Sequence, residues 1–338
     1  METLNYMETK IIDVYPFDKK HDVKVFHSGI TRTDINSKLS KYIEEKWALK
    51  KGWKNSWIPL VTMIEYLPDN RGIKITAQAF TYAQTHGCLE AIKNKEVFAP
   101  KVDGVPAINN LSIGLIPRIV DPATGEVFIL ISQRDKGLSH APGVWNFRGG
   151  YMTSLLFDRD NCDKPEYARD NRLYNIRTQA DLRIRKQEFE DTGRDVEFAP
   201  NPSSLAFGFY HSLEMELGWV ATFRKSREWI LEHASEHEVV KGQKEHSKEL
   251  FIPAKDLERL LLNQGDLLNV DPINYEPDDP TKIILLDCNV GELVGGAFEE
   301  ITGRKLDPSV VKHLRKKGLD IRVMDTPLGS SFTFPSKF

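Results

Sequence analysis

Pro142–Gly150 (PGVWNFRGG) and Arg185–Gly193 (RKQEFEDTG) are the two stretches that decide how the middle of this chain folds. The first follows Ile129–Arg134 (ILISQR), an apolar run with the composition of a strand. Its paired glycines allow the backbone to turn tightly and to approach a ligand closely. The second stretch carries several acidic residues and ends at Gly193, and a glycine commonly follows the last turn of a helix. The sequence therefore predicts a strand, a glycine turn and then an acidic helix that ends near Gly193.

These two stretches resemble the Nudix superfamily. Its lead-in reads G-x-W-x-x-P-G-G, and this chain has G-x-W-x-x-R-G-G, with Arg148 where proline is usual. The family's acidic box reads G-x5-E-x7-R-E-U-x-E-E-x-G-U, in which U is a bulky aliphatic residue. Counted back from Gly193, the paired glutamates of the box fall on Glu190 and Asp191. The resemblance covers about half of the chain.

The rest of the box can be aligned in two ways. Without a gap, Lys186 replaces the arginine, Gln187 replaces the glutamate beside it, and Glu188 falls on the aliphatic position. With one residue deleted after Phe189, Glu188 takes the glutamate position and Phe189 the aliphatic one, while Gln187 moves under the arginine. We prefer the second alignment because one deletion repairs two mismatches. The two acids before Gly193 keep their places in both.

The spacing between the glycines and the box is much longer than the family's. We interpret the extra residues, around Leu155 to Asn175, as a charged surface loop. The first glutamate of the box falls on Thr178 and is therefore missing. In the family that glutamate is mainly structural, so its loss matters less than a missing carboxylate at Gln187.

The resemblance implies a metal-dependent hydrolase that cleaves a nucleoside diphosphate linked to another moiety. Hard carboxylate oxygens bind Mg²⁺, which neutralises phosphate oxygens and makes a bound water more acidic. We expect Mg²⁺, with Mn²⁺ as the other candidate, to be held by the Gly149 carbonyl, Glu188, Glu190 and Asp191. A further ligand or base is expected at Glu245, which stands shortly before a strand at Glu249–Ile252. The expected catalytic residues are Glu188, Glu190, Asp191 and Glu245, and the expected substrate-binding residues are Arg134 and Arg148.

Two other functions stay open. Because Gln187 and the long insertion depart from the box, the domain could instead be catalytically degenerate and bind a nucleotide or a protein without cleaving it. RNA decapping ranks last, because the sequence contains no basic channel that would track a phosphate backbone. The net charge of −3 likewise gives no reason to expect DNA or an anionic membrane as a partner.

The chain divides into three expected regions within the α/β class. Residues 1–108 form an N-terminal α+β region, residues 109–272 a Nudix-type α/β/α sandwich, and residues 273–338 a C-terminal helical extension with a loose tail from Pro327. A weaker resemblance, carried by Tyr82–Gly87 and Asn110–Ser112, points to long Nudix proteins with an N-terminal extension. That extension could form a homodimer interface, and the oligomeric state stays open.

Several elements follow from local patterns. Asp34 or Ser37 is expected to cap a helix, and Trp57–Leu67 is rich in strand formers. Leu111–Val120 and Val127–Ser132 read as strands joined by a turn at Asp121–Gly125. Further expected elements are strands at Ser204–Tyr210 and Leu217–Phe223, a helix after Pro253, a helix at Val290–Gly303, and a basic helix that contains Lys312–Lys317.

Cysteine usage and the N-terminal residues indicate the compartment. Cys88, Cys162 and Cys288 are odd in number and far apart, so neither a disulfide framework nor a structural zinc site is indicated. No stretch has the roughly 18 apolar residues of a membrane span, and residues 1–18 lack the apolar core of a signal peptide. The reducing cytoplasm is therefore the expected location.

Overall fold

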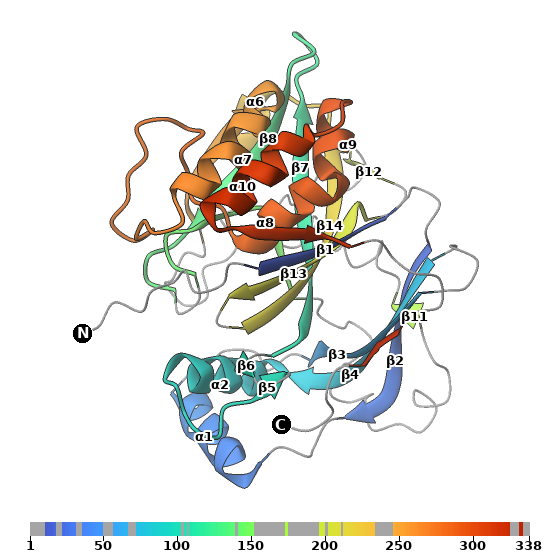
Figure 1. The fold of residues 1–338 in the computed structure, drawn as a ribbon, viewed down its shortest axis with the longest axis vertical. Helices are drawn as coiled ribbons and strands as arrows, with labels where there is room; N and C mark the ends of the chain where they lie inside the picture. The colour runs from blue at the N-terminus through green and yellow to red at the C-terminus, as the bar shows by residue number, and fades with distance from the viewer. Residues whose placement is uncertain are drawn as a thin grey trace.

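The computed structural model describes residues 11–17, 22–31, 36–49, 57–66, 72–102, 105–106, 108–138, 141–151, 173–174, 196–199, 202–210, 212–233, 246–324 and 331–333. One mixed sheet runs through the molecule, and helices gather in two groups at its two ends (Figure 1). The α/β class expected from the sequence is confirmed. Among the described residues, no helix is long and apolar enough to cross a membrane.

The main path of the sheet joins segments from all parts of the chain. In spatial order it contains β11 (Leu173–Tyr174), β2 (Asp22–Thr31), β4 (Gly72–Thr81), β3 (Trp57–Tyr66), β7 (Asn110–Val120), β14 (Ser212–Phe223), β13 (Ser204–Tyr210), β1 (Ile11–Pro16) and β16 (Asp320–Val323). Strands that pair beside this path are β8 (Val127–Arg134), β9 (Trp145–Asn146), β10 (Arg148–Tyr151), β12 (Val196–Phe198), β15 (His246–Pro253) and β17 (Ser331–Thr333). The short strands β5 (Lys101–Val102) and β6 (Val105–Pro106) pair with each other.

The N-terminal helices α1 (Ser37–Ala48) and α2 (Tyr82–Lys93) pack on β3 and β4. The cap of α1 is neither of the two expected residues: Asn36 accepts a hydrogen bond from the Lys38 backbone N–H with its side-chain oxygen. This position fits because Asn36 is the residue directly before the first helical one. The two helices approach closely at Gly87, where an added Cβ would lie 2.5 Å from Ile43 Cγ1.

The central hairpin of β7 and β8 forms as expected. Its turn is held by Asp121, whose Oδ1 accepts hydrogen bonds from the backbone N–H groups of Ala123 and Thr124. On its other edge β8 pairs with β15, which is longer than the predicted Glu249–Ile252. The next hairpin joins β13 and β14, and β14 begins at Ser212, five residues before the predicted start.

Both faces of the central sheet are buried, so its strands carry near-continuous apolar runs. Leu217 and Trp219 of β14 belong to one core, and Val220 belongs to the other. The second core also holds the apolar residues of the C-terminal helices, which are α7 (Leu257–Asp266, preceded by the 3₁₀ turn η2, Ala254–Asp256), α8 (Asp287–Glu292), α9 (Phe298–Thr302) and α10 (Pro308–Lys317). Helix α6 (Arg227–His233) contributes Ile230 to the first core.

The helix predicted at Val290–Gly303 differs from the observed one. It begins earlier, at Asp287, and contains a π-helical turn, η3 (Leu293–Ala297), in which Gly296 has φ 141°. Gly296, whose positive φ suits glycine, marks the irregularity, and the neighbouring Gly295 lies close to β1, where an added Cβ would lie 2.5 Å from Val14 Cγ1. The expected C-terminus at Gly303 is confirmed, with Gly303 in the left-handed conformation.

Packing crosses both boundaries expected between the three regions. β1 pairs with β13 and with β16, so segments from the first and third regions lie in the sheet of the middle one. Residues of α8 and α10 share a core with Trp145 and α7. The division into three regions at 108/109 and 272/273 therefore stays a prediction that describes only how the regions follow one another along the sequence.

Two segments expected to be loops contain strands. Leu173 and Tyr174, within the insertion, form β11 and pair with β2. Ser331–Thr333, within the tail expected to be loose, form β17 and pair with β3. Local composition could not indicate either strand, because each is fixed by a partner far away in the sequence. The helix expected to end near Gly193 lies outside the described residues.

Candidate functional site

The run Trp145–Gly150 lies inside the central sheet. Its first half, β9, pairs with β8 through Trp145↔Gln133 and Asn146↔Ser132. Its second half, β10, pairs instead with β7, where Gly149 lies opposite Gly114. Phe147 joins the two halves and is buried. The glycine pair, expected to form a tight turn, instead belongs to a strand that is bonded to the long strand β7.

The segment before α8 holds the other edge of β9. The Trp145 N–H donates to the Ile284 carbonyl at 2.8 Å, and the Trp145 carbonyl accepts from the Leu286 N–H at 2.9 Å. The next donor on the same edge is the Phe147 N–H, and its partner is a side chain. It donates to Oδ1 of Asn289 at 2.8 Å. The short strand that leads to Gly149 is therefore bonded on both edges.

A row of glycines crosses three neighbouring strands beside this segment. Gly149 of β10 lies opposite Gly114 of β7, which in turn lies beside Gly218 of β14. The side chain of Glu292 fills the space over two of them. An added Cβ at Gly114 would lie 2.3 Å from Glu292 Oε1, and one at Gly218 would lie 2.8 Å from Glu292 Cγ. Glycine is needed at these positions because another side chain approaches the sheet backbone.

Glu292 and Glu216 form a buried carboxyl pair over this row, and they are 0% and 6% exposed. The amide of Asn289 joins them: Nδ2 donates to Glu292 Oε2 at 3.0 Å and to Glu216 Oε2 at 3.4 Å. The thiol of Cys288 also donates to Glu216 Oε2, at 2.8 Å. Two acids are therefore held together away from solvent, a costly arrangement if both are charged.

The environment of Glu292 favours its neutral form. Burial, and next the nearby charge of Glu216, raise the pKa of the Glu292 carboxyl well above its usual value, while the hydrogen bond from Asn289 acts in the opposite direction. Within the described part of the chain, Glu292 Oε1 has no hydrogen-bond partner. Two negative charges on this pair are therefore disfavoured.

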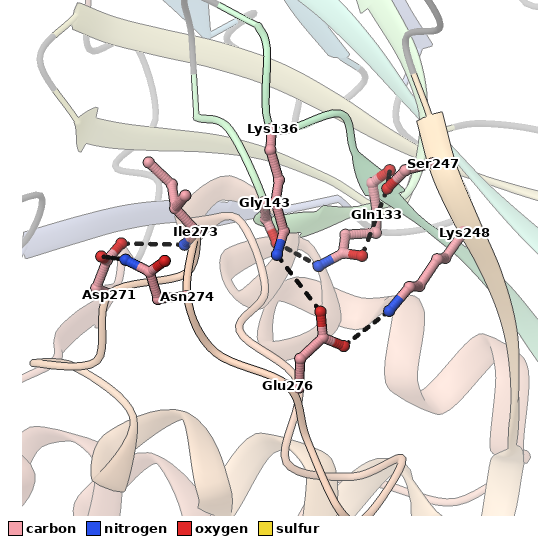
Figure 2. A network of polar contacts seen from close by, with 9 residues as sticks. All are labelled: Gln133, Lys136, Gly143, Ser247, Lys248, Asp271, Ile273, Asn274 and Glu276. Atoms are coloured by element: carbon pink, nitrogen blue, oxygen red, sulfur yellow. Dashed lines mark hydrogen bonds and ion pairs between the residues drawn. The ribbon is translucent and has the colours of Figure 1, made fainter.

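A second network fixes the loop between β8 and β9 (Figure 2). The buried Gln133 donates from Nε2 to the Gly143 carbonyl at 3.1 Å, and Ser247 of β15 donates to Gln133 Oε1 at 3.4 Å. On the surface, Glu276 accepts from Lys136 at 3.4 Å and from Lys248 at 2.7 Å. These contacts attach the loop that contains Glu276 to the segment that follows β8 and to β15.

The structure describes three of the predicted site residues, at least by their backbone. Arg134 ends β8, is half-buried, and exchanges backbone hydrogen bonds with the segment before β9. Arg148 and Gly149 lie in β10, with their backbone positions fixed by pairing to β7. The remaining predicted residues, Glu188, Glu190, Asp191 and Glu245, lie outside the described residues.

The metal prediction rests on those acids and stays a prediction. Among the described residues, no group of three or more His, Cys, Asp or Glu side chains could hold a metal ion. Of the four expected ligands, only Gly149 is described, and only by its backbone. The expected donor set, carboxylates with one carbonyl oxygen, consists of the hard oxygen ligands that Mg²⁺ binds.

Sequence reasoning missed the buried cluster Glu216, Asn289 and Glu292. Glu216 stands directly before the predicted strand Leu217–Phe223, and Asn289 directly before the predicted helix at Val290. A signal was present, because a spacing of three residues places Asn289 and Glu292 on one face of a helix. Gly114, within an otherwise apolar strand, likewise marks a close approach by another group.

Comparison with known proteins finds likeness at the level of structure alone. No family model matches the chain, and no curated protein matches it. Solved structures that match in part include a Nudix hydrolase from M. smegmatis (15% identity, 44% of this chain and 73% of that chain, TM-score 0.25). A second is the Nudix domain of a Shewanella oneidensis protein, solved with ADP-ribose (13% identity, 50% and 85%, TM-score 0.26). A third is a Nudix hydrolase from Alicyclobacillus acidocaldarius (11% identity, 59% and 97%, TM-score 0.25).

These likenesses are low in identity and concern part of the fold. Each solved structure covers between 44% and 59% of this chain. The argument about the site therefore rests on the residues of this chain and their geometry. In the motifs of its middle region, and in part of its structure, the chain is similar to Nudix hydrolases.

Proposed function

We propose that this protein is a Mg²⁺-dependent hydrolase that cleaves the diphosphate of a nucleoside diphosphate linked to another moiety. The observation that carries the proposal is the run Trp145–Gly150, whose glycines enter the sheet beside β7, in a chain that also carries Glu190, Asp191 and Gly193 in the spacing of the Nudix box. The nucleotide class follows from the resemblance, and the identity of the second moiety is left to experiment.

Each proposed residue has a defined task. Glu190 and Asp191, with the carbonyl of Gly149, hold the ion, and Glu188 binds it or orients the attacking water. Glu245 is a further ligand or the base that accepts a proton from water. Arg134 and Arg148 bind the phosphates, for which a guanidinium offers paired donors. When bound, Mg²⁺ would neutralise charge on the phosphate oxygens and make a water more acidic.

The geometry around Gly149 supports this proposal. A carbonyl ligand is useful only if its backbone is rigid, since small errors of position reduce catalysis strongly. Gly149 is fixed by pairing to Gly114, and the strand that leads to it is bonded on both edges. This segment is therefore suited to hold a carbonyl oxygen in a constant place.

The second candidate is a binding module that recognises a nucleotide or a protein without cleaving it. The observation that favours it is Gln187, an amide that stands where the ungapped alignment expects a carboxylate. An amide oxygen is a weaker ligand for a divalent cation than a carboxylate, so the ion would be held less tightly. The two candidates differ in turnover and not in the fold.

The test is hydrolysis of a panel that contains dinucleotides, nucleotide sugars, nucleoside triphosphates and ADP-ribose, with and without Mg²⁺. We expect metal-dependent turnover of at least one class, and we expect its loss in the Glu190→Gln, Asp191→Asn double variant. The matched control is Glu299→Gln with Glu300→Gln, which neutralises another adjacent acid pair, in the first turn of α9, and should keep full activity. Full activity of the first double variant would refute the proposal. No turnover by the folded protein, together with a nucleotide that raises its melting temperature, would favour the binding module.

A further inference from the structure

Asn289 completes a β-ladder with its side chain. The segment Ile284–Leu286 runs parallel to β9 and exchanges backbone hydrogen bonds with Trp145 at both its N–H and its carbonyl. The next hydrogen bond of the ladder, from the Phe147 N–H, would need a backbone carbonyl as its acceptor. By this point, however, the chain has already turned into α8. The amide oxygen of Asn289 takes that place and accepts from the Phe147 N–H at 2.8 Å. One side chain therefore bonds the last residue before β10.

The cluster fixes the orientation of this amide. Oδ1 accepts from Phe147, so the two N–H bonds of Nδ2 must face the other way. There they meet Glu292 Oε2 at 3.0 Å and Glu216 Oε2 at 3.4 Å. A flipped amide would turn Nδ2 toward the Phe147 N–H, donor against donor, and would leave that N–H without an acceptor. The two carboxyl groups offer acceptors to Nδ2 on the other side, and so they support the orientation in which Oδ1 faces Phe147.

A second support reaches the same segment from α7. Gln264 is buried, and its Oε1 accepts from the Leu285 N–H at 2.9 Å while its Nε2 donates to the Ile283 carbonyl at 2.9 Å. Gln264 therefore holds the segment that holds Trp145. Through these contacts, the C-terminal helices fix the backbone from Trp145 to Phe147 directly before the glycines.

We propose that Asn289 is a positioning residue, which fixes the place of the Gly149 carbonyl by bonding the Phe147 N–H while Glu216 and Glu292 orient its amide. This inference rests on the proposed function, in which that carbonyl is a metal ligand. Groups that orient metal ligands without touching the metal commonly contribute about 10–100-fold to metal affinity or activity. Asn289 contacts Phe147, which stands two residues before Gly149 in the sequence. Its effect on the Gly149 carbonyl is therefore indirect.

The test compares Asn289→Ala and Asn289→Asp with the full-length wild-type chain. The control is Asn263→Ala, because the side chain of Asn263 in α7 donates to the Thr281 carbonyl at 2.9 Å and does not contact β9 or β10. The first readout needs no activity: amide hydrogen exchange of peptides that cover residues 144–151. We expect faster exchange there in Asn289→Ala than in the wild type. We expect a smaller increase in Asn289→Asp, which keeps an acceptor oxygen for Phe147 but brings its second oxygen against the two carboxyl groups. The control should exchange like the wild type.

The second readout is the dependence of turnover on Mg²⁺ concentration. For Asn289→Ala we expect the half-activating Mg²⁺ concentration to rise and kcat to fall by about 10-fold or more, with KM for the nucleotide changed much less. The control should keep the wild-type Mg²⁺ dependence. Wild-type exchange at residues 144–151 together with an unchanged Mg²⁺ dependence in Asn289→Ala would overturn the inference.

Failure of the proposed function can be recognised separately. If the wild-type chain hydrolyses nothing in the panel, the proposed function fails, and the exchange measurement still decides whether Asn289 fixes the glycine strand. An increase of exchange over the whole described chain, equal in β7 and β10, would show that Asn289 is only a core residue. That result would overturn the positioning role even if activity is lost.

Discussion

The carboxyl group of Glu292 lies in an environment that disfavours its charged form. It is 0% exposed and faces Glu216, and it meets the Asn289 amide and the backbone of Gly114. An acid whose pKa is raised by folding keeps its proton in the folded state after the unfolded chain has lost it. The free energy of unfolding therefore decreases as the pH rises above the ordinary value of 4.5.

Glu292→Gln should remove this pH dependence, because glutamine has almost the same shape and stays neutral. We expect the variant to unfold at about the wild-type temperature at pH 5 and at a higher temperature than the wild type at pH 8, because only the wild type loses stability as the pH rises. Thermal unfolding followed between pH 5 and pH 8 measures the difference. The exposed Glu299→Gln serves as the control and should follow the wild type at every pH. A constant difference between Glu292→Gln and wild type across this range would contradict the expectation.

At the scale of helices and strands, the sequence predicted the features that depend on neighbouring residues, such as turns, apolar strands and helix ends. The turn at Asp121–Gly125 and the strands it joins follow from turn residues and apolar runs, and they form as expected. The same is true of the helix end at Gly303. The π-helical turn η3 was not predicted, and neither was the close approach of the distant Val14 to Gly295 beside it. The strands β11 and β17 depend on distant partners in the same way.

The candidate site shows the same division. The glycine pair at residues 149 and 150 was predicted from its motif, and its backbone lies in a strand within the sheet. Glu216, Asn289 and Glu292 come from β14 and α8, and only the fold brings them together. The spacing of Asn289 and Glu292 is a local signal, but no local pattern links them to Glu216, so the cluster was not foreseen. The acids predicted at Glu188, Glu190, Asp191 and Glu245 stay predictions.

Helix α2 offers a test of local stability. It begins with a capping box, in which Thr81 Oγ1 accepts from the Gln84 N–H at 3.1 Å and Gln84 Oε1 accepts from the Thr81 N–H at 2.7 Å. We expect Thr81→Ala to lower the free energy of unfolding by about 1 kcal/mol, a usual cost for loss of a cap. Thr81→Ser keeps the hydroxyl and should lose much less. Denaturant unfolding of both variants measures this, and an equal loss in the two would mean that the cap oxygen is not the cause.

At the scale of the whole molecule, the three expected regions do not pack as separate units. The core around Trp145 also contains Ile12 of β1, Leu260 of α7 and Ile321 of β16. The middle region alone would leave much of this apolar surface exposed to water. The free-energy cost of that exposure is about 25 cal/mol for each Å². The sequence predicted the order of the regions, but a pattern read along the chain does not report which segments share a core.

A fragment of residues 109–272 tests this sharing. We expect it to aggregate or to unfold without a cooperative transition, since it lacks β1, β16, α8 and α10. The control is the chain shortened to residues 1–324, which loses β17 and keeps every element of the second core, and which should unfold cooperatively. Solubility and thermal unfolding of the two fragments measure the difference. A soluble 109–272 fragment with a sharp transition would mean that the middle region is self-sufficient.

The pairing of β1 with β16 also affects how this protein is made. Asp13 and Arg322 join the two strands by an ion pair across 309 positions of the chain. On the ribosome, β1 emerges early but cannot meet β16 until about residue 323 has left the exit tunnel. During that interval the apolar faces of β1 and β13 stay partly uncovered and open to wrong partners. Contacts this distant also slow folding, because a long loop must close first. We therefore expect the nascent chain to depend on chaperones until β16 has emerged and paired with β1.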